Sequence, residues 1–146
     1  MRRIVIRFNA PVLLTFALLS LIALFLGNWT DGATTYRYFS VYRSSLGDPL
    51  TYLRMFTHVL GHADYSHYMN NMLLLLLVGP VVEEKYGHRN IFFCILLTAL
   101  VTGLVQFVFF PNTALLGASG IVFMMIVLSS FTEMRKEGIP ITLILV

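Results

Sequence analysis

Three long stretches of this sequence contain no Asp, Glu, Lys or Arg, and this feature constrains the fold more than any other. The stretches cover residues 8–30, 65–82 and 90–132. A helix that crosses a bilayer needs about 20 predominantly apolar residues. The third stretch is long enough for two such helices, and Pro111-Asn112-Thr113 provides a natural break between them. The sequence therefore predicts an all-α fold, a polytopic membrane helix bundle.

The predicted spans cover roughly residues 10–28, 66–82, 91–110 and 115–132. A fifth begins at Gly138-Ile139-Pro140, but the sequence stops at Val146. Composition agrees, because 58% of the residues are hydrophobic and only 12% are charged, whereas about a quarter are charged in soluble domains. We find no second domain. Residues 1–146 are therefore predicted to form a single membrane domain, incomplete at its C-terminus, with four complete spans and a partial fifth.

The distribution of Lys and Arg predicts the orientation of these spans. With a cytoplasmic N-terminus, seven of the ten basic residues fall on the cytoplasmic side: Arg2, Arg3, Arg7, Lys85, Arg89, Arg135 and Lys136. Positive charge concentrates on that side of membrane proteins, so we expect a multi-pass protein of the cell membrane with its N-terminus inside. The basic residues form no clustered face, so nucleic acid is not an expected partner. The long apolar stretches make the lipid bilayer an expected partner.

Two short polar signals stand at the heads of uncharged segments. One is Gly117-Ala118-Ser119-Gly120, and the other is His67-x-x-x-Asn71, whose two side chains share one helix face. Because successive spans run in opposite directions, both signals approach the same membrane surface. Directed N–H donors stabilise the oxyanion that forms when a serine attacks a carbonyl, and glycines allow close approach of a substrate. The pattern predicts a hydrolytic site built from Ser119, His67 and Asn71.

Simpler interpretations of both signals stay open. Small residues at a helix head also favour close helix packing, and serine is a common N-cap. His67 and Asn71 could equally bridge neighbouring helices. His58 and His62 have the i, i+4 spacing of metal ligands if their segment is helical, but the sequence has no His-Glu-x-x-His motif. We therefore expect a hydrogen-bonded histidine network and neither a metal nor a cofactor.

Other polar or small residues suit structural roles. The long loop from Asn28 to Ser66 is rich in aromatic residues, which favour the headgroup region, and it either lies at the interface or guides substrate. Glu83 and Glu84 diverge on a helix and are predicted to anchor the cytoplasmic turn. Ala99 and Gly103 have the small-xxx-small spacing of helix packing.

The motifs together resemble the rhomboid intramembrane serine proteases. The matching residues, in order, are Arg54-Met55-Phe56-Thr57-His58, His62, His67-x-x-x-Asn71, Gly79-x-x-x-Glu83-x-x-x-Gly87 and Gly117-Ala118-Ser119-Gly120. The resemblance implies a six-helix bundle that cleaves transmembrane segments of other membrane proteins near the outer surface.

By the same resemblance, Ser119 is the nucleophile, and His67 and Asn71 are oxyanion-hole side chains joined by the backbone N–H of Ser119. His62 belongs to a polar network that holds water near the site, and Arg54 and Glu83 are structural.

Two departures from the family pattern leave alternatives open. Leu53 stands where the family often has Trp, and no histidine follows His88, although rhomboids take their general base from a histidine on the sixth helix. Without a base, a serine hydroxyl is a weak nucleophile. His67 could serve instead, but the oxyanion hole would then lack a donor.

Three hypotheses follow. The chain is the N-terminal two-thirds of a rhomboid-type serine endopeptidase acting on transmembrane protein substrates, or a catalytically inactive relative that binds transmembrane helices, or a non-enzymatic membrane protein such as a transporter subunit.

Overall fold

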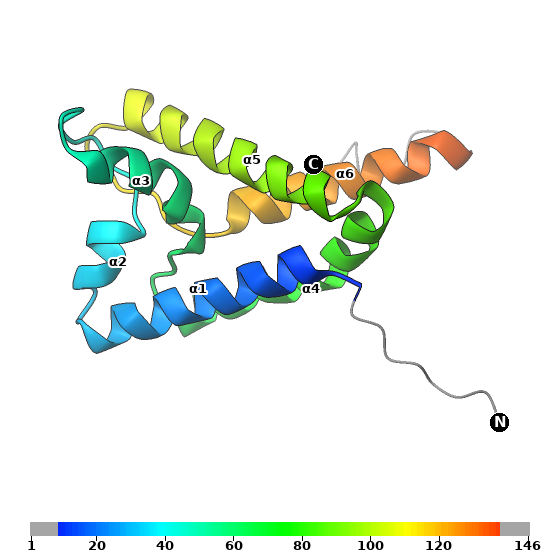
Figure 1. The fold of residues 1–146 in the computed structure, drawn as a ribbon, viewed down its shortest axis with the longest axis horizontal. Coiled ribbons are helices and arrows are strands. Elements are labelled where there is room, and N and C mark those ends of the chain that lie inside the picture. Colours follow the sequence, from blue (N-terminus) through cyan, green and yellow to red (C-terminus); the bar gives the residue numbers. More distant parts are fainter. Residues whose placement is uncertain (1–8, 138–146) are drawn as a thin grey trace.

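The computed structural model describes residues 9–137, and their side chains as far as Phe131. The described residues form six α-helices and one short 3-10 helix, and they contain no β-structure beyond an isolated antiparallel bridge between Val41 and Leu115. The elements are α1 (Pro11–Trp29), α2 (Ala33–Tyr38), α3 (Pro49–Thr57), η1 (His58–Leu60), α4 (Tyr65–Tyr86), α5 (His88–Phe109) and α6 (Ser119–Glu137) (Figure 1). The predicted all-α class is confirmed.

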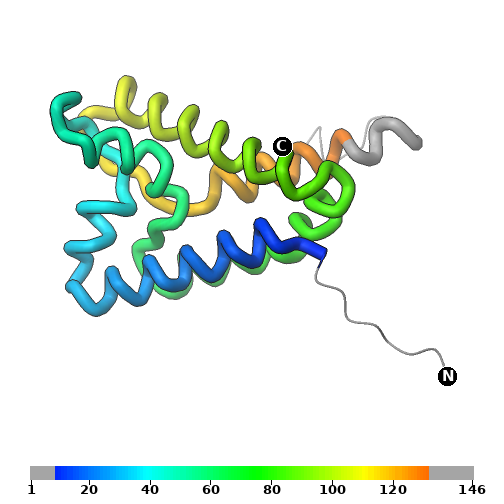
Figure 2. The backbone as a smooth tube through the Cα atoms, in the orientation of Figure 1, coloured from blue at the N-terminus to red at the C-terminus, as the bar shows by residue number. Residues whose placement is uncertain are grey.

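The helix α4 packs against both α1 and α6, and it lies alongside α1 over much of the length of α1 (Figure 2). Gly79 permits this approach, because a Cβ atom there would overlap the side chain of Leu13. The hydroxyl of Tyr68 donates to the carbonyl of Ala17 at 3.1 Å. Close packing over small residues and interhelical hydrogen bonds are the forces that join helices in lipid.

The core runs through the middle of this bundle. Its fully buried apolar side chains include Leu13, Leu24, Leu75, Ile91, Ile121 and Met125. Many other apolar side chains of the same helices are exposed, among them Leu77 at 72% and Phe109 at 71%. Helices that are apolar on every face are typical of a membrane environment.

The segment between α1 and α4 folds into short helices, whereas the sequence analysis read it as a loop. Asp48 begins α3, because its side chain accepts the N–H of Leu50 at 2.9 Å and Pro49 occupies the first helical turn. This cap and proline, rather than a long apolar repeat, define the start of α3, whereas α2 and η1 have no side-chain cap. Together with the α5–α6 connection these short helices close one end of the bundle (Figure 1). We call this end, residues 29–64 and 110–119, the site end, and the opposite end around the α4–α5 connection the turn end.

Each of the four predicted spans corresponds to a long helix, with shifted ends. The largest shift is in α6, which begins at Ser119 and not at residue 115, because Leu115 pairs with Val41 and Gly117 has a φ of +120°. Only α1 and α5 are long and apolar enough to count as membrane spans by length and composition, and the apolar part of α6, Ser119–Phe131, is shorter.

That α4 and α6 span the membrane therefore stays a prediction. In α4, the polar residues of the His67-x-x-x-Asn71 signal occupy the first two turns. The expected fifth span at Gly138-Ile139-Pro140, and basic residues Arg2, Arg3 and Arg7, lie outside the described residues.

Candidate active site

Ser119 is the first residue of α6, and its position is fixed by the segment that precedes it. Leu115 and Val41 exchange two backbone hydrogen bonds of 2.9 Å, and the N–H of Gly117 donates to the carbonyl of His58 at 2.9 Å. The Ser119 side chain is exposed and faces a groove between α5 and α6, whose lining includes Thr98, Thr102 and Gly120. Its hydroxyl has no hydrogen-bond partner among the described side chains.

Gly117 brings this segment against the second polar signal. A Cβ atom added to Gly117 would lie 2.8 Å from both Cε1 and Nε2 of His67, and 3.9 Å from Nδ2 of Asn71. The φ of +120° is a conformation that side chains with a Cβ rarely adopt. Glycine is therefore required at this position for two reasons: the backbone conformation and the close contact with the imidazole. The two signals, 50 residues apart in sequence (117 against 67), meet at this point.

His67 and Asn71 lie one turn apart on α4, as the spacing predicts. The carboxylate of Asp64 begins this helix by accepting the N–H of His67 at 2.8 Å. Asn71 is buried, and its Nδ2 donates to the His67 carbonyl at 3.1 Å. A longer contact of 3.5 Å runs from the N–H of Ala63 to Nδ1 of His67. Because Nδ1 accepts a hydrogen bond, the neutral imidazole carries its proton on Nε2, which lies on the edge of the ring that faces Gly117.

The remaining histidines of the site end have separate partners. Both ring nitrogens of buried His58 are engaged, Nδ1 with the carbonyl of Arg54 and Nε2 with the hydroxyl of Thr102, each at 3.1 Å. Burial lowers the pKa of His58. The ring of His62 lies edge-on to the rings of His67 and Tyr68, at centroid distances of 5.0 and 5.4 Å. The two histidines therefore take part in different contacts, His58 with α5 and His62 with the His67 and Tyr68 rings.

His62 is buried with one unsatisfied atom. Its Nδ1 bonds to the Leu60 carbonyl at 3.2 Å, while Nε2 has no partner among the described residues. Burial is the main reason that the pKa of His62 falls to about 4, so the ring is neutral at pH 7.

A polar stripe on α5 was missed by the sequence analysis. Thr102 contacts His58, and the buried Gln106 donates from Nε2 to the carbonyl and hydroxyl of Thr113 at 3.0 and 2.9 Å. Thr98, Thr102 and Gln106 follow at intervals of four in the uncharged stretch 90–132, and that periodicity was the available signal. Gly103 on this helix packs against the backbone of Met55, as the small-residue spacing predicted.

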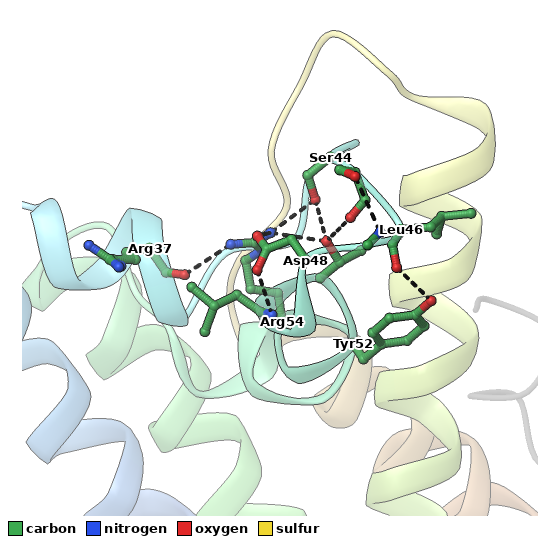
Figure 3. Close-up of polar contacts among 10 residues, drawn as sticks. Arg37, Ser44, Leu46, Asp48, Tyr52 and Arg54 are labelled. Carbon is green, nitrogen blue, oxygen red and sulfur yellow. Dashed lines mark hydrogen bonds and ion pairs between the residues drawn. The ribbon is translucent and has the colours of Figure 1, made fainter.

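Arg54 holds the site end together from inside. Its guanidinium contacts Asp48 at 3.2 Å, the Ser44 hydroxyl at 2.9 Å and the Arg37 carbonyl at 3.3 Å (Figure 3). The same guanidinium lies 4.5 Å from the ring centroid of Tyr42. Arg54 is only 2% exposed, so its charge is neutralised within the fold and serves to hold α2, α3 and their connection in place.

Glu83 has a comparable role at the turn end. It is fully buried and accepts the backbone N–H groups of Val12 and Leu13 at 2.9 and 3.0 Å. His88 Nδ1 contacts the same carboxylate at 2.7 Å. Glu83 therefore caps α1 and links it to the start of α5. It lies 16 residues along α4 from His67, about 24 Å by helical rise, which is too far to serve the site. Its neighbour Glu84 is exposed.

The comparisons with known proteins agree with this arrangement. The sequence profile of the Rhomboid domain family matches residues 49–145, which is more than half of the chain. Rhomboid-like protein 11, chloroplastic, from Arabidopsis thaliana is 31% identical over 77 residues, and the match covers 52% of this chain. The same match covers 28% of that relative's length. The matched range contains Arg54, both polar signals and Glu83, whereas the partners of Arg54 from Arg37 to Asp48 precede it.

Proposed function

This chain belongs to the rhomboid family, and we propose that it is a serine endopeptidase that cleaves transmembrane segments of other membrane proteins. In this proposal Ser119 Oγ attacks the scissile carbonyl, whose oxygen becomes an oxyanion. Nε2–H of His67, Nδ2–H of Asn71 and the backbone N–H of Ser119 stabilise that oxyanion. The serine proton passes to a base and then to the departing amine, and water hydrolyses the acyl-enzyme.

The observation that carries the proposal is the contact of Gly117 with His67 and Asn71. A Cβ at Gly117 would lie 2.8 Å from the imidazole, so there is room beside His67 only for backbone. The residue two positions later begins α6 with an exposed hydroxyl. A helix N-terminus adds unpaired N–H groups at the same place. Nucleophile, donors and backbone amides are thus concentrated within a few residues of one contact.

The tautomer of His67 favours the oxyanion role over the alternative role of base. Its Nδ1 accepts the N–H of Ala63, so the neutral ring presents a proton, and no lone pair, at Nε2. A general base needs a free lone pair toward the serine hydroxyl. An oxyanion donor needs the proton that His67 has at Nε2, and each such donor contributes about 3–4 kcal/mol in measured enzymes.

One observation favours a second candidate, a rhomboid-like protein that binds transmembrane helices without cutting them. The printed sequence has four histidines, none of them after His88. No described side chain bonds to the Ser119 hydroxyl, so no base is in place among the described residues. For proteolysis, the proposal needs a base that this stretch of sequence does not supply.

A fluorophosphonate probe separates the two candidates, because it reacts only with an activated serine. The protease proposal predicts labelling of the purified protein that Ser119→Ala abolishes and Ser66→Ala, an exposed serine at the start of α4, leaves intact. Cleavage of a detergent-solubilised transmembrane peptide is expected to show the same dependence. Labelling absent from the protein with its native C-terminus supports the binding candidate and contradicts the protease.

We also propose that the site end faces the outside of the cell membrane, with the N-terminus in the cytoplasm. Lys85 and Arg89 lie at the turn end, and the sequence predicts that seven of the ten basic residues share the cytoplasmic side, which supports this orientation. In a Cys94→Ser background, a cysteine at Ser45 should react with a membrane-impermeant maleimide in intact cells, and a cysteine at Glu84 should react only after lysis. The reverse pattern contradicts the orientation but leaves the site unchanged.

A further inference from the structure

A second cavity adjoins the candidate active site at the site end. It has a volume of about 700 Å³ and lies where the end of α1 meets α2, the His62 loop and the segment before Ser119. Its lining includes Asn28, Asp31, Thr35, Ser40, His62 and Leu116. Leu116 directly precedes Gly117, and His62 lies edge-on to His67. Two residues of the cavity lining are therefore direct neighbours of the candidate active site.

The polar lining of this cavity combines a carboxylate with groups that can both donate and accept, among them Asn28, Thr35 and Tyr36. The buried His62 Nε2 has no partner among the described residues, and because Nδ1 faces the Leu60 carbonyl, Nε2 carries a lone pair and no proton. The Asp31 carboxylate forms no hydrogen bond or ion pair with any described side chain. The hydroxyl of Ser40 already donates to the Thr35 carbonyl at 3.0 Å, which leaves its oxygen free to accept.

No described cation neutralises the cavity. Asp31 is its one formally charged lining residue. Arg54 is committed to Asp48, and Arg43 donates to the carbonyls of Phe107 and Val108 at 3.1 and 2.8 Å. Arg37 lies over the ring of Tyr38, at 5.6 Å from its centroid. A site with a carboxylate and hydroxyl oxygens beside a neutral imidazole is complementary to a group that carries several N–H donors and a positive charge.

We infer that this cavity receives the ammonium or guanidinium group of a basic residue on the polypeptide bound at the candidate active site. The inference rests on the function proposed above and adds a preference among its substrates. An extended chain advances about 3.3 Å per residue, so a polypeptide held at Gly117 passes Leu116 and Ala114 within a few residues. Both of these residues line the cavity. A lysine or arginine side chain has the reach to extend from there toward Asp31.

The test measures binding without requiring cleavage. The Ser119→Ala protein in detergent is titrated with fluorescein-labelled peptides that contain a Leu/Ala transmembrane helix and a Gly/Ser flanking segment. One lysine is placed at each of six consecutive flanking positions, and the reference peptide has norleucine there. We expect lysine at one or two adjacent positions to lower Kd about fivefold, as for a partly enclosed ion pair. Equal Kd values for lysine and norleucine at all six positions overturn the inference.

Substitutions at Asp31 identify the cavity as the source of the preference. Asp31 has a φ of +50°, which asparagine also tolerates, so Asp31→Asn removes the charge and keeps the backbone. It should abolish the lysine preference, whereas Asp31→Glu should retain part of it. Glu84→Gln removes the same charge from an exposed position at the turn end and should change nothing. A lysine preference that survives Asp31→Asn contradicts the assignment.

This outcome is distinguishable from failure of the proposed protease activity. If fluorophosphonate labels Ser119 but the protein shows no lysine preference, the inference is wrong and the proposed function stands. If the protein prefers lysine peptides but fluorophosphonate does not label it, the cavity stands as a specificity site for bound helices and the proposed protease activity is wrong.

Discussion

The two ends of the bundle differ in whether their polar groups have hydrogen-bond partners within the fold. At the turn end, the buried carboxylate of Glu83 accepts three hydrogen bonds, from Val12, Leu13 and His88. At the site end, the buried Nε of Arg54 and Nε2 of His62 have no partners among the described residues, and the Ser119 hydroxyl is exposed. Both ends contain groups that are costly to desolvate, but only one of them satisfies those groups internally.

This difference distinguishes polar groups that stabilise the fold from polar groups that are available to a ligand or a reaction. A buried polar group without a partner destabilises a fold by about 1–3 kcal/mol, so it persists where a ligand or reaction uses it. A fully bonded carboxylate such as Glu83 fixes one helix arrangement. The site end also contains a hydrogen-bonded cluster around Arg54 (Figure 3), in which only Nε of the guanidinium has no partner among the described residues. We therefore expect substitutions at the turn end to change stability and those beside His67 to change activity.

The largest expected effect is that of Gly117→Ala. The added methyl group meets the His67 ring at 2.8 Å, at a φ of +120°, so either the imidazole or the start of α6 must move. Loss of oxyanion stabilisation should lower kcat/KM about 10²–10³-fold, measured with a transmembrane peptide substrate.

Gly87→Ala is the matched control for that substitution. Gly87 also has a positive φ, +87°, but open space surrounds its Cβ position at the turn end. It should lower the free energy of unfolding by about 1 kcal/mol and leave kcat/KM unchanged. Equal activity losses in both variants would show that backbone strain, rather than the contact with His67, causes the effect.

The next effect is on stability alone. Glu83→Gln keeps the shape of the side chain but removes the charge that three donors share. We expect it to lower the free energy of unfolding in detergent by about 2–4 kcal/mol. Glu84→Gln, an exposed neighbour, should stay within about 0.5 kcal/mol. If Glu83→Gln unfolds like the unsubstituted protein, Glu83 does not clamp α1.

Acid should destabilise the site end through His62. Its pKa is lowered from 6.5 to about 4 in the fold, so the unfolded chain binds this proton more readily. The stabilisation is complete above pH 6.5 and is lost as the pH falls toward 4, by up to about 3 kcal/mol.

His62→Gln cannot titrate, and it should therefore lose less stability between pH 7 and pH 4 than the unsubstituted protein. Thermal unfolding in detergent across this range measures the difference. The lowered pKa of His58 leaves a slope of the same sign in both proteins. Identical pH dependence in the two would contradict burial of a neutral His62.

The smallest effect is expected at Thr102, the polar residue that sequence analysis missed. Thr102→Val removes the hydroxyl that contacts Nε2 of His58 at 3.1 Å and leaves that buried nitrogen unpaired, which costs about 1 kcal/mol. Thr98→Val, one turn earlier on α5, removes a hydroxyl at the same groove and should have less effect on unfolding. A larger loss of unfolding free energy for Thr98→Val than for Thr102→Val would contradict the assignment of Thr102 as the partner of His58.

Several features of the site could be predicted from the sequence because they depend on local spacing. The i, i+4 relation puts His67 and Asn71 on one face of α4, and the alternation of uncharged segments puts Ser119 at the same end of the bundle. From the sequence, Gly117 and Gly120 were predicted to allow close approach of a substrate. The contact of Gly117 with the His67 side chain could not be predicted, because the two residues are 50 positions apart (117 against 67).

Other features depended on contacts that no local pattern records. The short helices α2 and α3 lack a long apolar repeat and are held by Arg54, whose partners extend from Arg37 to Asp48. The start of α6 shifted to Ser119 because Leu115 pairs with Val41 across the chain. The stripe of Thr98, Thr102 and Gln106 had a visible period, but His58 and Thr113 became its partners only through folding.

The sequence by itself determined that this chain forms apolar helices and that its serine and histidine signals occur at one end, because charge exclusion and helical period act along the chain. The tertiary structure alone decided that Gly117 abuts the imidazole, that Glu83 caps α1, and that Asp31 and His62 line one cavity. Those facts are distances between residues far apart in sequence, and only the packing of helices against one another sets them.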